Sequence, residues 1–242
     1  MNRNQKLIFS IFLPVAFLEL IMIYAFNNSD NIRYFEFAVT IIMLAMAAAV
    51  KKGFREQKIL VLSFMFSAVG EFFLLIYPIM KEGATGTMQG LAAFLLAYAF
   101  IILALNRSFR WSLSDGLLLL PFICVIGVMF GTLHRYLEGT MLIAVIVFSA
   151  AICIMGWTAV ATLTRGYFVK RVAVMSALAG VMIFASDFVA AYQIFYPTLH
   201  SSPSIPTEIF VRATFVAAWT LLLAIVFDGN ILAGGHPKAL KK

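Results

Sequence analysis

The stretch from Thr140 to Leu163, TMLIAVIVFSAAICIMGWTAVATL, decides the fold class because it carries no charged residue along a length that can cross a lipid bilayer. A membrane-spanning helix needs about 20 apolar residues, whereas a helix on the surface of a soluble protein is apolar on one face only. The run also lacks the strict alternation of apolar and polar residues that is typical of a membrane β-strand. We therefore predict a transmembrane α-helix here.

Seven further segments of the same character lie on either side of this one. They are Leu7–Phe26, Tyr34–Val50, Ile59–Tyr77, Met88–Leu105, Leu113–Phe130, Val172–Phe195 and Ile209–Phe227. They explain why a chain of 242 residues is 63% hydrophobic and only 12% charged. The connections between them are too short to hold a soluble domain. The sequence predicts an all-α membrane protein, with residues 1–242 forming a single domain of about eight transmembrane helices.

The basic residues indicate the orientation of the chain in the membrane. If the eight segments cross the bilayer in turn, 14 of the 18 Lys and Arg residues fall on the side that holds both termini: Arg3, Lys6, Lys51, Lys52, Arg55, Lys58, Arg107, Arg110, Arg165, Lys170, Arg171, Lys238, Lys241 and Lys242. The other side has Arg33, Lys81, Arg135 and Arg212. Basic loops favour the cytoplasm, so we expect both termini there. These loops account for the net charge of +7 without nucleic-acid binding.

Among the charged residues of the predicted spans, four are taken as candidates for a functional site: Glu19, Glu71, Asp187 and Arg212. A charge at the centre of a membrane helix costs at least ~2.5–3.5 kcal/mol, so each of them needs a reason. A rise of about 1.5 Å per residue places Glu19 and Glu71 roughly 18 Å from the cytoplasmic side. The same rise places Asp187 at roughly 23 Å and Arg212 at roughly 25 Å, in a core about 30 Å thick. A common level predicts one polar cavity in the outer half of the membrane.

Glu71 and Asp187 each lie in a polar stretch of sequence. Ser67 precedes Glu71 by one helical turn on the same face, and Ser186 is the direct neighbour of Asp187. Intramembrane acids are typically functional, which favours a functional role for this pair over a purely structural polar contact.

The other polar or aromatic candidates have simpler alternatives. Arg212 can instead extend its side chain to the outer interface, and Glu19 can be an isolated neutral carboxyl that makes one structural hydrogen bond. Tyr98 and Trp219 lie near the middle of their spans, where aromatic residues more often pack than react.

Residue types that are missing from the spans exclude several classes of membrane protein. The histidines, His134, His200 and His236, all lie outside the eight segments, so no metal site of the usual histidine type can form within the bilayer. None of the segments contains a lysine, which excludes a retinal Schiff base. We expect no metal and no other cofactor.

Three stretches resemble motifs of the YhhN family, the lysoplasmalogenase-type membrane proteins. They are Phe66–Leu74 (FSAVGEFFL), which is similar to F-S-x-x-G-D-x-x-L, then Met155–Ala159 (MGWTA), and Gly180–Asp187 (GVMIFASD), which is similar to a family motif that ends in Ser-Asp. Phe195–Pro197 fits as well. The resemblance covers most of the chain from the third segment onward. Three positions differ from the family pattern: Glu71 replaces the usual Asp, Tyr98 stands where histidine is expected, and Trp219 stands where glutamine is usual.

The resemblance implies eight helices and hydrolysis of the vinyl ether bond of a lysoplasmalogen to a fatty aldehyde and a glycerophospho head group. It implies that Glu71 and Asp187 are the catalytic pair, in a bacterial inner membrane. A vinyl ether is cleaved by protonation of its β-carbon and addition of water, which needs one protonated acid and one carboxylate. We expect Glu71 to donate the proton and Asp187 to be the carboxylate, with the reverse assignment left open.

The remaining site residues are expected to surround the lysophospholipid substrate. Ser67 and Ser186 would orient the two carboxyl groups, and Arg212 would hold the lipid phosphate. Tyr98, Trp219 and Glu19 complete the expected substrate-binding set.

Two other functions remain open. The first is a lipid-binding or proton-coupled transport protein on the same fold, in which the two acids form a proton site and no bond is cleaved. The second is a hydrolase that acts on a lipid ester or amide, which the absence of a recognisable Ser, Cys or His nucleophile motif disfavours.

Overall fold

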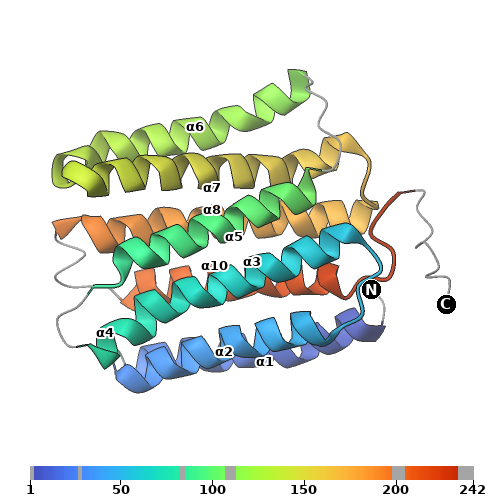
Figure 1. The fold of residues 1–242 in the computed structure, drawn as a ribbon, viewed down its shortest axis with the longest axis horizontal. Helices are drawn as coiled ribbons and strands as arrows, with labels where there is room; N and C mark the ends of the chain where they lie inside the picture. The colour runs from blue at the N-terminus through green and yellow to red at the C-terminus, as the bar shows by residue number, and fades with distance from the viewer. Residues whose placement is uncertain (1–2, 27–28, 82–84, 107–112, 198–204, 234–242) are drawn as a thin grey trace.

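The computed structural model describes residues 3–26, 29–81, 85–106, 113–197 and 205–233. Helices make up nearly all of this part of the chain (Figure 1). The long helices are α1 (Arg3–Phe26), α2 (Asp30–Ala49), α3 (Arg55–Glu71), α5 (Thr87–Leu105), α6 (Leu113–Leu133), α7 (Gly139–Arg165), α8 (Lys170–Phe195) and α10 (Ile205–Val226). The short ones are the π-helical turn η1 (Phe72–Ile76), α4 (Tyr77–Met80) and the 3₁₀ turn η2 (His134–Tyr136).

Eight of the helical stretches in the described residues are long and apolar enough to span a membrane, with α3, η1 and α4 counted as one stretch. The prediction of an all-α protein with eight transmembrane helices is confirmed. The helices begin up to four residues earlier than expected, as in α2, which starts at Asp30, and α10, which starts at Ile205. Polar residues extend these ends, since the apolar pattern marks the hydrocarbon core and not the whole helix.

A π-helical turn follows Glu71 directly. Pro78 lacks a backbone N–H, and its ring would clash with the carbonyl four residues earlier in a regular α-helix. The chain widens between Phe72 and Ile76, and the N–H of Tyr77 donates to the carbonyl of Phe72, five residues back. Such turns are frequent at functional sites. This one turns Leu74 and Leu75 toward the cavity described below.

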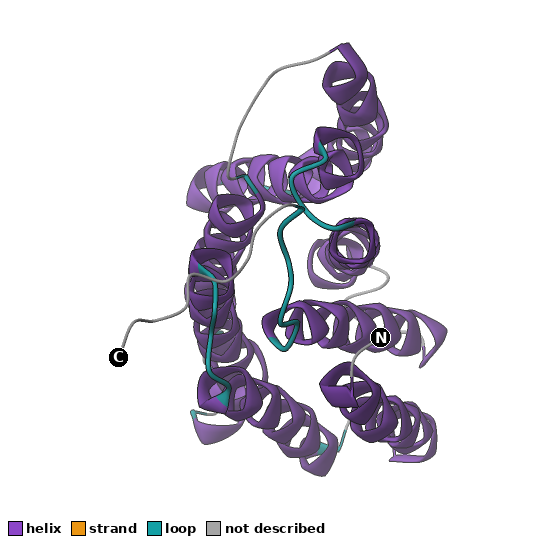
Figure 2. Ribbon diagram, turned by 90° about the vertical axis from the view of Figure 1, so that its right-hand side faces the viewer, coloured by secondary structure: helices purple, strands orange, loops and turns teal. Residues whose placement is uncertain are grey.

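Neighbouring helices run side by side along most of their length. α3 packs against α5, α8 lies between α7 and α10, and α1 packs against α10, which leaves α6 at the outside of the bundle (Figures 1 and 2). Gly180 allows α7 and α8 to approach closely, because a Cβ atom at this position would lie 2.3 Å from the Cβ of Ala159. Small residues at such crossings are typical of membrane helices.

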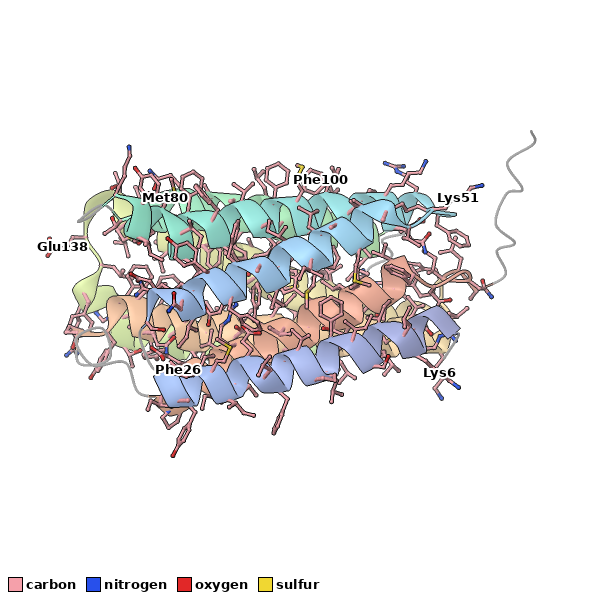
Figure 3. The ribbon with its side chains drawn as sticks, turned by 90° about the horizontal axis from the view of Figure 1, so that it is seen from below. Lys6, Phe26, Lys51, Met80, Phe100 and Glu138 are labelled. Atoms are coloured by element: carbon pink, nitrogen blue, oxygen red, sulfur yellow. The ribbon has the colours of Figure 1, made fainter. Side chains whose placement is uncertain are left out.

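The two ends of the bundle differ in character. Lys6 and Lys51 lie at one end, here called the Lys6 end, and Phe26, Met80 and Glu138 lie at the other, the Phe26 end (Figure 3). This placement agrees with the predicted alternation of the spans, and the cytoplasmic location of the termini remains a prediction. Five of the residues used for that prediction lie outside the described part of the chain: Arg107, Arg110, Lys238, Lys241 and Lys242. The same is true of His200 and His236, which were named for the metal-site argument.

A polar network ties the helices together at the Lys6 end. The amide nitrogen of Gln57 donates to the carbonyl of Val226 (3.0 Å), the last residue of α10, and to that of Asp228 (2.7 Å), just past its end. The buried carboxylate of Asp228 accepts from Gln5 at 2.9 Å and pairs with Arg171. These bonds satisfy carbonyls that the helix end leaves open and fix this end of the bundle.

Candidate functional site

A cavity of about 300 Å³ extends from the Phe26 end into the bundle. Its wall includes the terminal turns of α2, α8 and α10, represented by Arg33, Gln193 and Glu208. Deeper positions include both motif acids, Glu71 and Asp187. A concave, mainly apolar site with a few converging polar groups is the usual form of a small-molecule site.

Arg212 of α10 is the centre of a buried charge cluster on one side of this cavity. Its nitrogen atoms lie within ion-pair distance of three carboxylate oxygens: 2.9 Å from Glu19, 3.1 Å from Glu36 and 2.7 Å from Glu71. The three acids come from α1, α2 and α3, so one guanidinium links four helices. The hydroxyl of Thr40 donates to the second oxygen of Glu71 at 2.9 Å. The cluster holds three carboxyl groups against a single cation.

Asp187 lies in a different environment on α8. Its Oδ2 accepts a hydrogen bond of 2.6 Å from the hydroxyl of Tyr98, a side chain with no exposed surface. The Tyr98 ring packs against Phe94 and Phe148, with centroid distances of 6.0 and 5.6 Å. Within the described residues, Asp187 makes no ion pair and its Oδ1 has no hydrogen-bond partner. One motif acid is therefore held by a cation and the other by a phenol.

The two serines do not orient the carboxyl groups as expected. The hydroxyl of Ser186 donates to the backbone carbonyl of Val211 at 3.1 Å and ties α8 to α10. The buried hydroxyl of Ser67 has no partner in the part of the chain that the structure describes. The polar neighbours of Glu71 come from other helices, which a pattern along one helix cannot reveal.

Arg212 is not placed as a phosphate-binding residue. It is 9% exposed, and its guanidinium faces three carboxylates, so an incoming phosphate would meet a surplus of negative charge. The same contacts exclude the alternative in which Arg212 extends to the outer interface. Glu19, which pairs with this guanidinium, is also not an isolated carboxyl. These two expectations are corrected by the shared ion-pair cluster.

Four members of the expected substrate-binding set lie behind the cavity wall. Glu19, Ser67, Tyr98 and Trp219 are buried and do not line the cavity, although the Tyr98 hydroxyl reaches Asp187, which does. Trp219 is 2% exposed, and its ring packs on Phe64 and Phe215 at centroid distances of 4.9 and 5.8 Å. These residues support the wall from the far side.

Sequence reasoning missed several polar residues of this region. Glu36 and Thr40 belong to the charge cluster, and Arg33 and Glu208 line the outer part of the cavity. Glu36 had the same signal as Glu71, a charge inside a predicted span. Thr40 had no comparable signal because threonine is common in membrane helices.

The described residues contain no group of three or more His, Cys, Asp or Glu side chains arranged to hold a metal ion. In the cluster of three glutamates, the Arg212 guanidinium takes the position between the carboxylates.

The model of the YhhN family matches residues 32–226, which include Glu36, Glu71, Asp187 and Arg212. Searches of the curated proteins and of the solved structures returned no match. The family match covers most of the chain and begins within α2, so α1 with Glu19 lies outside it. On the strength of this match and of the eight-helix fold, the chain belongs to the YhhN family.

Proposed function

We propose that this protein is a membrane hydrolase that cleaves the vinyl ether bond of a lysoplasmalogen, releasing a fatty aldehyde and a glycerophospho head group. The observation that carries the proposal is that Glu71 and Asp187, from distant parts of the sequence, line one cavity. Membership of the YhhN family supports it.

The cavity has the polarity that a single-chain lipid requires. Its outer part is polar, and its inner wall is formed by apolar side chains that include Leu91, Phe94, Phe148, Ile152 and Phe215. A hydrocarbon chain gains about 0.8 kcal/mol for each CH₂ group that it buries, which favours placing the alkenyl chain in the inner part. The vinyl ether, which joins this chain to the glycerol unit, then lies at the level of the two acids.

The hydrogen bonds favour Asp187 as the proton donor. Its Oδ1 has no partner within the described residues and can carry the proton, while Tyr98 holds Oδ2. Both oxygens of Glu71 accept hydrogen bonds, from Arg212 and Thr40, which suits a carboxylate because it is an acceptor only. This is the reverse of the assignment that the sequence first suggested.

The reaction then follows from these two states. Asp187 transfers its proton to the β-carbon of the vinyl ether. This leaves an oxocarbenium ion, in which the α-carbon and the glycerol oxygen share the positive charge. The carboxylate of Glu71 stabilises this positive charge and accepts a proton from the water that adds to it. In the resulting hemiacetal, the bond between the carbon and the glycerol oxygen breaks. The glycerol side leaves as an alcohol and the chain leaves as an aldehyde. Glu71 returns its proton to that oxygen, and Asp187 takes up the hydroxyl proton of the hemiacetal.

A lipid-binding or proton-coupled transport protein is the second candidate. The observation in its favour is the buried cluster of Glu19, Glu36, Glu71 and Arg212, because charged networks between membrane helices are typical of proton pathways. In this case the cavity would bind the lipid and release it unchanged.

A direct assay separates these functions. The protein is purified in detergent with a chelator present, and release of aldehyde from lysoplasmenyl-ethanolamine is followed for wild type, Glu71→Gln and Asp187→Asn. Loss of one catalytic carboxyl should lower the rate by about 10²–10⁴-fold. Glu138→Gln is the control, because Glu138 is exposed and does not line the cavity.

Each result has a defined meaning. Release by wild type and by Glu138→Gln, lost in both other variants, supports the two-carboxyl mechanism. No release from folded wild type, with lipid still bound, would overturn the hydrolase assignment in favour of lipid binding or transport. Cleavage of the acyl analogue in place of the vinyl ether would point to an ester hydrolase.

A further inference from the structure

Two residues of opposite charge, Arg33 and Glu208, line the outer part of the cavity, each about one helical turn nearer the Phe26 end than a member of the charge cluster. Arg33 precedes Glu36 by three residues on α2, and Glu208 precedes Arg212 by four on α10. Residues with these spacings lie on the same helix face, about 4.5 and 6 Å apart along the axis. The cavity therefore has an outer pair, Arg33 and Glu208, which lies nearer the Phe26 end, and an inner pair, Glu36 and Arg212.

The outer pair is accessible, unlike the inner one. The Arg33 side chain is 40% exposed, and its single ion pair among the described residues is a long contact of 3.8 Å with the exposed Asp30. Glu208 is half-buried and makes no ion pair in the described part of the chain, and it lines the same cavity as Arg33. The outer part of the cavity thus presents one cation and one anion from two different helices.

We propose that Arg33 and Glu208 form a subsite for a zwitterionic lipid head group, with Arg33 binding the phosphate and Glu208 binding the ammonium group. The proposal deepens the function proposed above, because it names the head-group class of the same substrate. Arg33 binds the phosphate in place of Arg212, whose guanidinium already faces three carboxylates. Arginine is well suited to phosphate because its fork of N–H donors matches two phosphate oxygens.

The dimensions of the site agree with this placement. In a lysolipid, the glycerol unit separates the phosphate from the first bond of the chain. On α8, Gln193 of the outer part and Asp187 are six residues apart, which is about 9 Å along the helix. A head group held by Arg33 and Glu208 therefore leaves the glycerol unit to span the distance to the acids, with the chain beyond them.

Glu208 determines which head groups fit. A phosphate with an ammonium group complements both charges of the outer pair, whereas a phosphoglycerol head group has an anion and no cation to pair with Glu208. An unpaired carboxylate next to an anion is unfavourable, so the subsite discriminates against anionic lipids.

The proposal is tested by binding, with lipids that cannot be cleaved. Three 1-O-alkyl lipids of equal chain length are compared: the glycerophosphoethanolamine, the glycerophosphoglycerol, and the alkylglycerol without phosphate. Their affinities for wild type, Arg33→Gln and Glu208→Gln are measured by native mass spectrometry. Lys81→Gln and Glu138→Gln are the matched controls, since both residues are exposed and lie outside the cavity wall. Glu138 lies at the Phe26 end, and Lys81 directly follows Met80, which lies there too (Figure 3).

The expected pattern depends on the head group. Arg33→Gln lowers the affinity for both phosphate lipids about tenfold, because loss of one charge-assisted contact corresponds to about 1.4 kcal/mol. It leaves the affinity for alkylglycerol unchanged. Glu208→Gln has a lower affinity than wild type for the ethanolamine lipid. Its affinity for the phosphoglycerol lipid is equal to or higher than that of wild type.

Two results would overturn the proposal: equal weakening of all three lipids by either variant, or the same change in the control variants. No cleavage is involved, so a failure of the hydrolase assignment, seen as absent aldehyde release, is distinguished from a failure of this subsite.

Discussion

The guanidinium of Arg212 in α10 lies 2.7 Å from the carboxylate of Glu71 in α3, and this pair connects the last span of the bundle to the first motif acid. Buried ion pairs add little stability on balance, but an unpaired buried charge is very costly. Arg212 is therefore required chiefly because three glutamates surround it. Its effect on the chemistry is indirect, through the position and charge state of Glu71.

Removal of this cation should destabilise the fold. Arg212→Met leaves Glu19, Glu36 and Glu71 buried without their partner, and we expect the free energy of unfolding to fall by about 3–5 kcal/mol. Thermal unfolding in detergent measures this, with Arg33→Gln as the control, since exposed ion pairs contribute about 0–1 kcal/mol. Equal effects of the two variants would contradict the role given to the cluster.

The glutamates that share Arg212 should differ in their importance for the reaction. Glu19 does not line the cavity, so Glu19→Gln keeps the shape of the side chain and should lower the rate of aldehyde release by less than about tenfold. Glu71→Gln should lower it by about 10²–10⁴-fold. The comparison is made at saturating substrate, with folding checked by thermal unfolding. A loss of equal size in both variants would show that the cluster acts as one unit and that Glu71 has no special part.

Tyr98 should act through Asp187. Tyr98→Phe retains the ring that packs on Phe94 and Phe148 but removes the hydroxyl that donates to Oδ2. Asp187 becomes a carboxylate as it gives up its proton, and a hydrogen bond to a charged group contributes about 1.5–3 kcal/mol, so we expect a decrease of roughly ten- to a hundredfold in kcat with little change in KM. The pH–rate profile should also move, because a hydrogen bond to the carboxylate is one of the factors that determine the proton affinity of an acid. A variant with lower kcat and an unchanged profile would indicate a packing role alone.

The sequence predicted the helices well because lipid imposes a simple rule on them. A span must be long and apolar, and this pattern is visible one segment at a time, as in Thr140–Leu163. The same rule identified Glu71, Asp187 and Arg212 as unusual. Glu36 met this criterion also and was missed.

The contacts between these residues could not be predicted in the same way. The partner of Asp187 is Tyr98, 89 positions away, and Thr40 reaches Glu71 from another helix. Such pairs depend on how helices rotate and cross, which is decided by close packing at particular positions and not by hydropathy. For this reason Ser67 and Ser186, the sequence neighbours of the acids, were wrongly expected to orient them.

The crossing of α7 and α8 at Gly180 can be used to test whether the position of Asp187 depends on close helix packing. α8 carries Asp187, and α7 contributes Phe148, Ser149 and Ile152 to the cavity wall. A methyl group at Gly180 would lie 2.3 Å from the Cβ of Ala159, so Gly180→Ala must push the two helices apart. We expect it to lower the free energy of unfolding by about 1–3 kcal/mol and to reduce aldehyde release beyond what unfolding explains.

Gly127→Ala on α6 is the matched control for this prediction, because a Cβ atom there would have no neighbour within 4 Å. Alanine is the better helix former by about 1 kcal/mol, so this variant should be as stable as wild type or slightly more so. Both are measured by thermal unfolding and by aldehyde release at a temperature where each is folded. If Gly180→Ala behaved like Gly127→Ala, the close approach of α7 and α8 would not determine the geometry around Asp187. The acid would then owe its position to the hydrogen bond from Tyr98.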